Sequence, residues 1–287
     1  MLIESLGDST IYMSYYIIVR FIESGELKIE NLTLSFFDYV LLGKGDLAAA
    51  SADTGLNPEL LEEIRRHFNY WYPVDLRSSG KDLVPNHLLF FLFHHVALFE
   101  EDKWPKALAV NGFVSLEGQK MSKSKGPILT MENAVSTYGA DITRMYILST
   151  AEQTQDADWQ KTGIESARRQ MDRFYSFAKN VIESGKRADL STELKQIDHW
   201  ILSRIQNYIK GTNTALYSIQ TREAIQNSFF LLQNDIKWYQ RRGGDTLLYY
   251  VLDNWVRLMA PFTPHLCEEI WEAMGHKDGL SCPVPSL

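Results

Sequence analysis

Residues 110–126 read VNGFVSLEGQKMSKSKG, an apolar run followed by a cationic loop. Three lysines and two serines fall within residues 120–125. Lysine supplies a mobile point charge with three donors, and serine adds hydroxyl donors of little bulk. Donors that are already in place stabilise the charge that develops on a leaving pyrophosphate. The stretch therefore predicts a strand that ends in a polyphosphate-binding loop, and a solvated basic loop is the alternative.

The composition is that of an ordinary folded protein. The chain has 287 residues, 45% of them hydrophobic and 23% charged, which suffices for one large or two ordinary domains. Its formal net charge of −7 means that nucleic acid could be bound only by local basic patches. Cys267 and Cys282 lack metal-ligand spacing and suggest no disulfide framework. Without a bilayer-spanning stretch or a signal-peptide layout, we expect a cytoplasmic protein with no bound metal.

Helical patterns dominate the first 73 residues. We expect helices over residues 11–21, 35–43 and 57–67. Asp8-Ser9 is the expected N-cap of the first helix, and Gly25 is expected to end it. Asn57-Pro58 combines a cap with a proline at the first helical position, which predicts the start of the third helix.

The next segment predicts half of a βαβ unit. Residues 74–77 form an expected strand, residues 78–80 a turn, and residues 85–99 an apolar and therefore buried helix. In open α/β sheets the ligand lies at the carboxyl ends of the strands, where this turn would sit. Gly80 would let a nucleotide approach the backbone. Asp82 would either accept hydrogen bonds from ribose hydroxyls or cap the helix.

The approach to the lysine loop allows two interpretations. Asn111-Gly112 stands between two apolar runs and predicts a β-hairpin. Alternatively the turn is irregular, and the second run enters a parallel sheet. His94 and His95, on the apolar helix before it, are expected to be core histidines.

The second half of the chain predicts a helical bundle. We expect helices over residues 131–138, 140–150, 159–184, 195–219, 222–241, 245–260 and 264–275. The expected breaks are glycines and a proline: Gly139, Gly185, Gly211, Gly243-Gly244 and Pro261. Thr221 is an expected N-cap. Antiparallel helices joined by short loops form a bundle.

Several segments resemble leucyl-tRNA synthetases of the archaeal and eukaryotic type. Residues 120–124 match the KMSKS loop of class I synthetases residue for residue, and residues 79–83 (SGKDL) and 86–90 (NHLLF) are similar to that family. Residues 8–12 resemble the segment by which the family re-enters its catalytic domain after the editing insertion. The valyl and isoleucyl enzymes share the KMSKS loop but differ around the Gly-Asp turn, which favours the leucyl family.

The resemblance implies an α/β plus all-α fold. Residues 1–125 would be the second half of a class I Rossmann-like catalytic domain, residues 126–160 a stem-contact linker, and residues 161–287 an anticodon-binding-type helical bundle. No His-x-Gly-His segment, editing domain or extra C-terminal domain is found. We therefore expect a fragment of a larger enzyme that is inactive by itself.

The resemblance also implies roles for individual residues. Lys120 and Lys123 would be catalytic and would bind the phosphates of ATP. The other expected ATP-binding residues are Gly80, Asp82, Phe113, Val114, Met121, Ser122 and Ser124. Tyr12 and His87 would line the leucine pocket. The candidates for tRNA contact are basic residues on expected helices: Arg144, Arg168, Arg169, Arg173, Lys237, Arg241 and Arg242.

The implied activity is that of a leucine–tRNA ligase. Leucine would react with ATP, accompanied by Mg²⁺, to give leucyl-adenylate, and leucine would then be transferred to tRNA(Leu). The alternatives are a stand-alone tRNA-binding or interaction module derived from a class I synthetase, and a fragment of a valyl- or isoleucyl-type enzyme.

Overall fold

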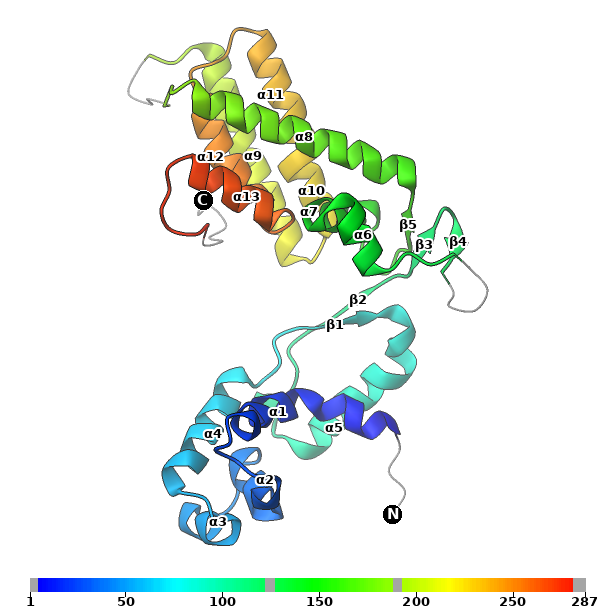
Figure 1. Ribbon diagram of the computed structural model, residues 1–287, viewed down its shortest axis with the longest axis vertical. Helices are drawn as coiled ribbons and strands as arrows, with labels where there is room; N and C mark the ends of the chain where they lie inside the picture. The colour runs from blue at the N-terminus through cyan, green and yellow to red at the C-terminus, as the bar shows by residue number, and fades with distance from the viewer. Residues whose placement is uncertain (1–4, 122–126, 188–192, 281–287) are drawn as a thin grey trace. The chain divides into compact units, whose positions relative to one another are not determined.

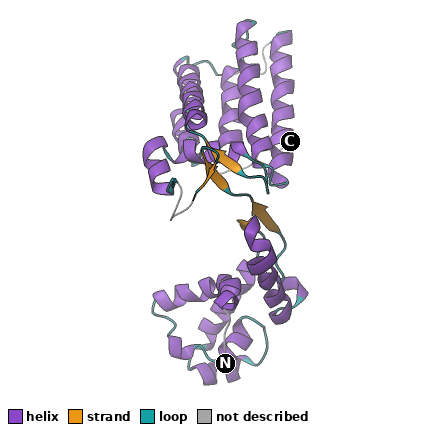
Figure 2. Cartoon of the chain, turned by 90° about the vertical axis from the view of Figure 1, so that its right-hand side faces the viewer, coloured by secondary structure: helices purple, strands orange, loops and turns teal. Residues whose placement is uncertain are grey.

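The computed structural model describes residues 5–121, 127–187 and 193–280, apart from the side chains of residues 5 and 8. The chain forms two compact units, Met1–Asn111 and Gly112–Leu287, each of which is described separately (Figure 1). Helices make up most of the described structure, and the strands are short (Figure 2). The expected combination of α/β and all-α structure is confirmed.

The first unit consists of five α-helices and a two-stranded sheet within the described residues. Its helices are α1 (Ser5–Glu23), α2 (Leu34–Val40), α3 (Leu47–Thr54), α4 (Pro58–Trp71) and α5 (Leu89–Leu98). Short 3-10 turns at Ile29–Asn31, Lys81–Leu83 and Glu101–Lys103 and a π turn at Val84–Leu88 complete it. Phe21, Phe36 and Phe68 of α1, α2 and α4 are fully buried together and form the centre of its core.

The ends of these helices test the predicted caps. Helix α1 begins at Ser5, so Asp8-Ser9 lies inside it, and that N-cap prediction was wrong. Gly25, at φ +80°, follows the end of α1 as predicted. The Asn57 side chain accepts a hydrogen bond from the Glu59 N–H at 2.9 Å, which confirms the cap of α4. Helix α3 was not predicted, although Asp46 caps it through the Ala48 N–H at 2.9 Å.

The sheet of the first unit differs in register from the prediction. Strands β1 (Arg77–Gly80) and β2 (Leu108–Asn111) are parallel, with Gly80 opposite Asn111. The residues expected to form a turn are therefore a strand, and the expected strand lies three residues too early. The apolar β2 supplies the partner for the polar β1, and such pairing cannot be found from one segment alone. Helix α5 is apolar but not wholly buried, since Phe93 is 60% exposed.

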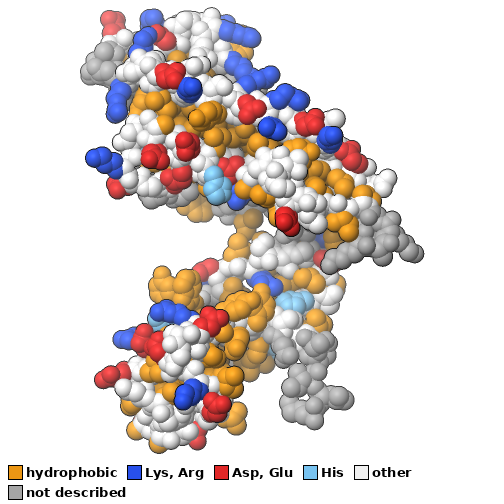
Figure 3. Space-filling model, in the orientation of Figure 1, with side chains coloured by type: hydrophobic (Ala, Val, Ile, Leu, Met, Phe, Trp, Pro, Cys, Tyr) orange, Lys and Arg blue, Asp and Glu red, His pale blue; other side chains and the backbone are white. Residues whose placement is uncertain are grey.

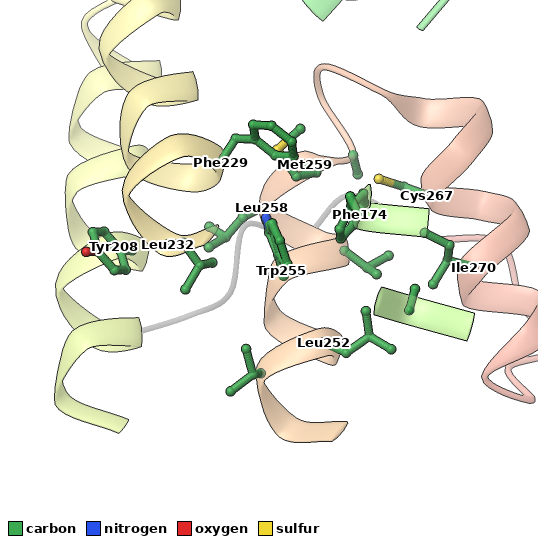
Figure 4. Close-up of a cluster of buried hydrophobic side chains, with 14 of the residues drawn as sticks. Phe174, Tyr208, Phe229, Leu232, Leu252, Trp255, Leu258, Met259, Cys267 and Ile270 are labelled. Atoms are coloured by element: carbon green, nitrogen blue, oxygen red, sulfur yellow. The ribbon is translucent and has the colours of Figure 1, made fainter. Parts of the chain in front are cut away.

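The second unit is a helical bundle with a small sheet at one end. Its strands are β3 (Val114–Leu116), β4 (Gln119–Lys120) and β5 (Ala157–Trp159). Its helices are α6 (Met131–Tyr138), α7 (Ala140–Thr150), α8 (Lys161–Glu183), α9 (Gln196–Tyr217), α10 (Thr221–Ile225), α11 (Leu232–Arg241), α12 (Leu248–Met259) and α13 (Pro264–Ala273). A π turn at Gln226–Leu231 joins α10 to α11. Figure 4 shows Phe174 beside Trp255 in the bundle core, where their ring centroids are 4.4 Å apart.

Three predictions about the bundle were wrong. Trp159, expected to begin a helix, is the last residue of β5, and α8 begins at Lys161. Gly211 does not break a helix but lies within α9, where a Cβ atom would be 3.1 Å from the Asn227 side chain. The glycine therefore allows close packing of α9 on the π turn. Thr221 is the first residue of α10 and not its N-cap. Gly185 and Gly243, both at positive φ, follow the ends of α8 and α11 as predicted.

Within the described part of the chain, no helix is both long enough and apolar enough to cross a bilayer.

Candidate active site

The predicted site residues fall in both units. Tyr12, Gly80, Asp82 and His87 belong to the first unit, and Phe113, Val114, Lys120 and Met121 to the second. Ser122, Lys123 and Ser124 lie outside the described residues. The two groups are described in turn.

Lys120 is the last residue of a β-hairpin. Strands β3 and β4 pair antiparallel, with Ser115 opposite Lys120. The two residues of the connecting turn, Glu117 and Gly118, have φ angles of +50° and +74°, which is the pattern of a type I′ turn. The apolar run predicted to lead into the lysine loop is β3, and an unpredicted turn and β4 separate it from Met121. The rest of the loop, residues 122–125, lies outside the described residues.

Asn111-Gly112 does not form the predicted hairpin. The Gly112 N–H donates to the Gln153 carbonyl at 3.0 Å, and a Cβ atom on Gly112 would lie 2.2 Å from the Gln155 carbonyl oxygen. The glycine is needed because two stretches of backbone approach closely there. Strand β3 then pairs in parallel with β5, with Val114 opposite Ala157. The alternative interpretation, entry into a parallel sheet, is therefore correct.

Phe113 presents its ring, while its backbone is engaged within the protein. Its N–H donates to Asp156 Oδ1 at 2.7 Å, and its carbonyl accepts from the Ala157 N–H at 2.8 Å. The residue is 44% exposed, and Lys120 Nζ lies 5.6 Å from the centroid of its ring. A cation at that distance from the ring is weakly attracted to it. A contact between ATP and the Phe113 backbone would have to compete with these bonds.

Asp158 holds the hairpin from the neighbouring strand. Its Oδ1 accepts from Ser115 Oγ at 2.6 Å and from the Gly118 N–H at 2.9 Å, and its Oδ2 accepts from Gln160 Nε2 at 3.0 Å. The Ser115 hydroxyl, followed by the other two donors, lowers the pKa of Asp158 from its ordinary value. Asp158 was not among the predicted site residues. The only feature of the sequence that marks Asp158 is the pair of acidic residues, Asp156 and Asp158, before Trp159.

In the first unit, Gly80 and Asp82 lie at the carboxyl end of β1. A Cβ atom on Gly80 would be 2.6 Å from Asp82 Oδ1, so the carboxylate folds back over the glycine. Asp82 is exposed, and its carbonyl accepts from Asn86 Nδ2 at 3.2 Å. The pair therefore stands where a parallel sheet binds ligands.

His87 is 93% buried and only partly satisfied. Its Nε2 lies 2.9 Å from the Ser9 carbonyl oxygen. Because a carbonyl only accepts, Nε2 carries the proton and Nδ1 is left as an acceptor. Among the described residues, Nδ1 is buried and has no hydrogen-bond partner. Burial of an unpaired acceptor is unfavourable, so this atom can receive a donor from a ligand.

Tyr12 lies on α1, one helical turn beyond Ser9. Because His87 Nε2 contacts the Ser9 carbonyl, both candidates for the leucine pocket are located at the same part of α1. The Tyr12 hydroxyl accepts a hydrogen bond from Arg77 Nη1, at the start of β1.

The expected core role of His95 is confirmed. It is fully buried, with Nδ1 2.8 Å from the Phe91 carbonyl oxygen and Nε2 3.3 Å from the Tyr72 hydroxyl. His94 is half-buried, with Nδ1 2.5 Å from Thr10 Oγ1.

The basic candidates for tRNA contact lie on three helices. Arg168, Arg169 and Arg173 are exposed on α8, and Lys237, Arg241 and Arg242 are exposed on or just after α11. Arg144, on α7, forms an ion pair with Asp141 at 2.9 Å. Figure 3 shows Lys and Arg side chains over the bundle surface, with Asp and Glu among them. Within the described residues, no group of three or more His, Cys, Asp or Glu side chains could hold a metal ion.

Comparison with known proteins agrees with this arrangement. The family described as "tRNA synthetases class I (M)" matches residues 59–171, and "Anticodon-binding domain of tRNA ligase" matches residues 198–286. A leucine–tRNA ligase of Methanosarcina barkeri is 94% identical over 98% of this chain, and one of Methanococcoides burtonii is 64% identical over 96%. The chain spans 29% of the length of each.

A solved structure shares the fold. It is a leucyl-tRNA synthetase of Agrobacterium radiobacter K84 in a ternary complex with tRNA and LeuAMS, with a TM-score of 0.68 and 21% identity over 87% of this chain and 31% of that one. The sequence matches carry the assignment further than the fold alone does. The chain belongs to the leucyl-tRNA synthetase family, of which it comprises part of the class I catalytic region and the anticodon-binding domain.

Proposed function

We propose that this chain forms the lysine-loop part of the catalytic domain, and the helical bundle, of a leucine–tRNA ligase. The observation that carries the proposal is the 94% identity to such a ligase over nearly the whole chain. The same ligase would use ATP with Mg²⁺, leucine and tRNA(Leu), and it would act in the cytoplasm.

In the proposed reaction an oxygen of the leucine carboxylate forms a bond to the α-phosphate of ATP. The bond to the β-phosphate breaks, and pyrophosphate leaves with the electron pair. Lys120 and Lys123 would meet the phosphates with positive charge that is in place before the bond breaks. Mg²⁺ bound to the nucleotide would neutralise part of the same charge. A ribose hydroxyl at the end of tRNA would then attack the activated carbonyl, and AMP would leave.

Residues of the first unit would bind the ribose of ATP and the leucine. Asp82, exposed beside Gly80, would accept hydrogen bonds from the ribose hydroxyls of ATP. His87 Nδ1, a buried acceptor, would face the leucine pocket that Tyr12 also lines. Both assignments follow the family resemblance, and the geometry of each group supports them.

A segment exchange tests the proposal. These residues replace the matching segment of the Methanosarcina barkeri ligase, and leucine-dependent ATP–pyrophosphate exchange is measured. We expect the chimera to be active and Lys123→Ala to lower its kcat by about two to three powers of ten, with a small change in the KM for leucine. Lys179→Ala is the matched control, because Lys179 is an exposed lysine on α8. An inactive chimera, or Lys123→Ala as active as Lys179→Ala, would contradict the proposal.

The alternatives have less support. A valyl- or isoleucyl-type enzyme does not account for the identity to leucine–tRNA ligases. A tRNA-binding module without ATP chemistry has no need of the lysine loop. The exchange assay separates both from the ligase, since only leucine activation requires leucine and Lys123 together.

A further inference from the structure

The turn of the lysine hairpin is held by the junction between β5 and α8, which follows it by about forty residues in the sequence. Residues 158–161 contact the turn through side chains and backbone on both sides. Figure 1 shows β3, β4 and β5 together at the beginning of α8. The position of Lys120, two residues after the turn, therefore depends on this junction.

Glu117 makes the first part of the connection. Its φ of +50° is uncommon for a residue other than glycine. Its N–H donates to the Trp159 carbonyl at 2.9 Å, and its Oε1 accepts from the Lys161 N–H at 2.7 Å. Lys161 is the first residue of α8, where the N–H groups lack partners within the helix and favour a negative charge. Glu117 thus forms part of the turn with its backbone and caps α8 with its side chain.

Asp158 makes the second part. It accepts hydrogen bonds from Ser115 on β3 and from the Gly118 N–H in the turn. These two bonds fix the turn relative to β5. Among the described residues, no hydrogen bond or ion pair joins Asp158 to Lys120.

Helix α8 is itself firmly placed. It packs on α7, α12 and α13, and its Ile164, Phe174 and Ala178 are fully buried. A hairpin that is bonded to the first turn of α8 is therefore bonded to the bundle.

We propose that Glu117 and Asp158 are positioning residues for Lys120, which fix the hairpin to the start of α8 so that the lysine ammonium group meets the phosphates of ATP at a set place. This inference rests on the proposed function. Neither residue touches substrate; both act through the hairpin. A displacement of about 1 Å at a reacting group can lower a rate by about a hundredfold, so loss of either carboxylate should reduce kcat.

Kinetics of the Methanosarcina barkeri chimera provide the first test. We expect Glu117→Ala and Asp158→Ala to lower the kcat of leucine-dependent exchange by about ten- to a hundredfold, with the KM for leucine nearly unchanged. Glu117→Gln and Asp158→Asn keep an oxygen acceptor and should recover most of the activity. Glu152→Ala is the control, since Glu152 caps α10 in the same way but does not contact the hairpin. It should leave kcat nearly unchanged.

Hydrogen exchange of the 287-residue chain provides a second test that does not depend on activity. The Gly118 amide should exchange at least about tenfold faster in Asp158→Ala, because its acceptor is lost, and at an unchanged rate in Glu152→Ala. The inference is overturned if both alanine variants lower kcat no more than Glu152→Ala while the parent chimera is active and Lys123→Ala is not. An inactive parent chimera would instead refute the proposed function.

Discussion

Glu152 caps α10 from outside the helix, since its Oε1 accepts from the Glu223 N–H at 2.7 Å. Its Oε2 accepts from the Arg222 N–H at 3.2 Å. Asp141 does the same for α13, where its Oδ2 accepts from the Leu266 N–H at 2.7 Å. Carboxylates on or just after α7 thus satisfy N–H groups at the starts of helices that come much later in the chain.

Removal of the Glu152 cap should weaken the bundle. We expect Glu152→Ala to lower the free energy of unfolding by about 1 kcal/mol, as loss of an N-cap does. The change is measured by denaturant unfolding monitored by the fluorescence of the buried Trp255. Glu272→Ala is the control, because Glu272 is an exposed carboxylate. Equal stability of the two variants would show that the cap contributes nothing.

A side chain at Gly112 should not be tolerated. Because a Cβ atom would lie 2.2 Å from the Gln155 carbonyl oxygen, Gly112→Ala must displace β3 or the segment before β5. We expect a loss of about 1–3 kcal/mol in stability. Gly7→Ala is the control, since Gly7 lies in α1 with nothing within 4 Å of its Cβ position, and it should be neutral or stabilising. Thermal unfolding of both variants gives the comparison.

Acid should destabilise the first unit through His95. Burial lowers the pKa of His95 below its ordinary value of 6.5, so the folded state favours neutral imidazole. The stabilisation is complete above pH 6.5 and is lost as the pH falls from 6.5 through the folded-state pKa. Hydrogen exchange of α5 between pH 7.5 and 5.5 should therefore show increasing opening.

His95→Gln should flatten that pH dependence even if it lowers stability at every pH. His199→Gln replaces an exposed histidine of the second unit and should leave the pH dependence of α5 unaltered. A slope that persists in His95→Gln would assign the effect to another group.

The two basic surfaces can be distinguished by tRNA binding. If α8 carries the contact, a combined Arg168→Glu, Arg169→Glu and Arg173→Glu variant of the chimera should bind tRNA more weakly. The slope of log binding constant against log salt concentration should become shallower by up to about three. The corresponding changes at Lys237, Arg241 and Arg242 test α11. If neither set alters binding, the predicted tRNA contacts on both helices are wrong.

The 287 residues assayed alone should fold and yet fail to activate leucine. The bundle buries a continuous core around Trp255, so helices after Trp159 should be protected from hydrogen exchange. Leucine-dependent pyrophosphate exchange should be absent, because the 287 residues contain no His-x-Gly-His segment. Each donor that is missing from a charge-stabilising site lowers the rate by about two to three powers of ten. Robust exchange by this chain would overturn the expectation.

Features with a local cause were predicted from the sequence, whereas features that depend on a distant segment of the chain were missed. The cap and proline at Asn57-Pro58 and the helix-ending Gly25 have causes within a few residues, and both predictions were confirmed. Gly211 and Gly112 were misinterpreted because each glycine serves a close approach to a segment far along the chain. The polar β1 was placed too early, since the strand that it pairs with lies about thirty residues later.

The candidate site shows the same division. The apolar run before the lysine loop predicted β3, but not the turn and the short polar β4 that carry Lys120. Glu117 and Asp158 were missed, since a carboxylate that caps a remote helix or accepts from a remote turn has no local sequence pattern. His87 was singled out by resemblance, and only the structure shows that its Nδ1 is unpaired among the described residues.

The type I′ turn at Glu117-Gly118 has a consequence for protein engineering. A lysine loop transplanted into another scaffold with β3 and β4 alone would lose the acceptors of Ser115 and Gly118 and the N–H group that Glu117 binds. The smallest portable unit of this loop is therefore discontinuous. It consists of the hairpin together with residues 156–161, and a graft that omits the second piece would carry Lys120 on a hairpin that lacks these hydrogen bonds.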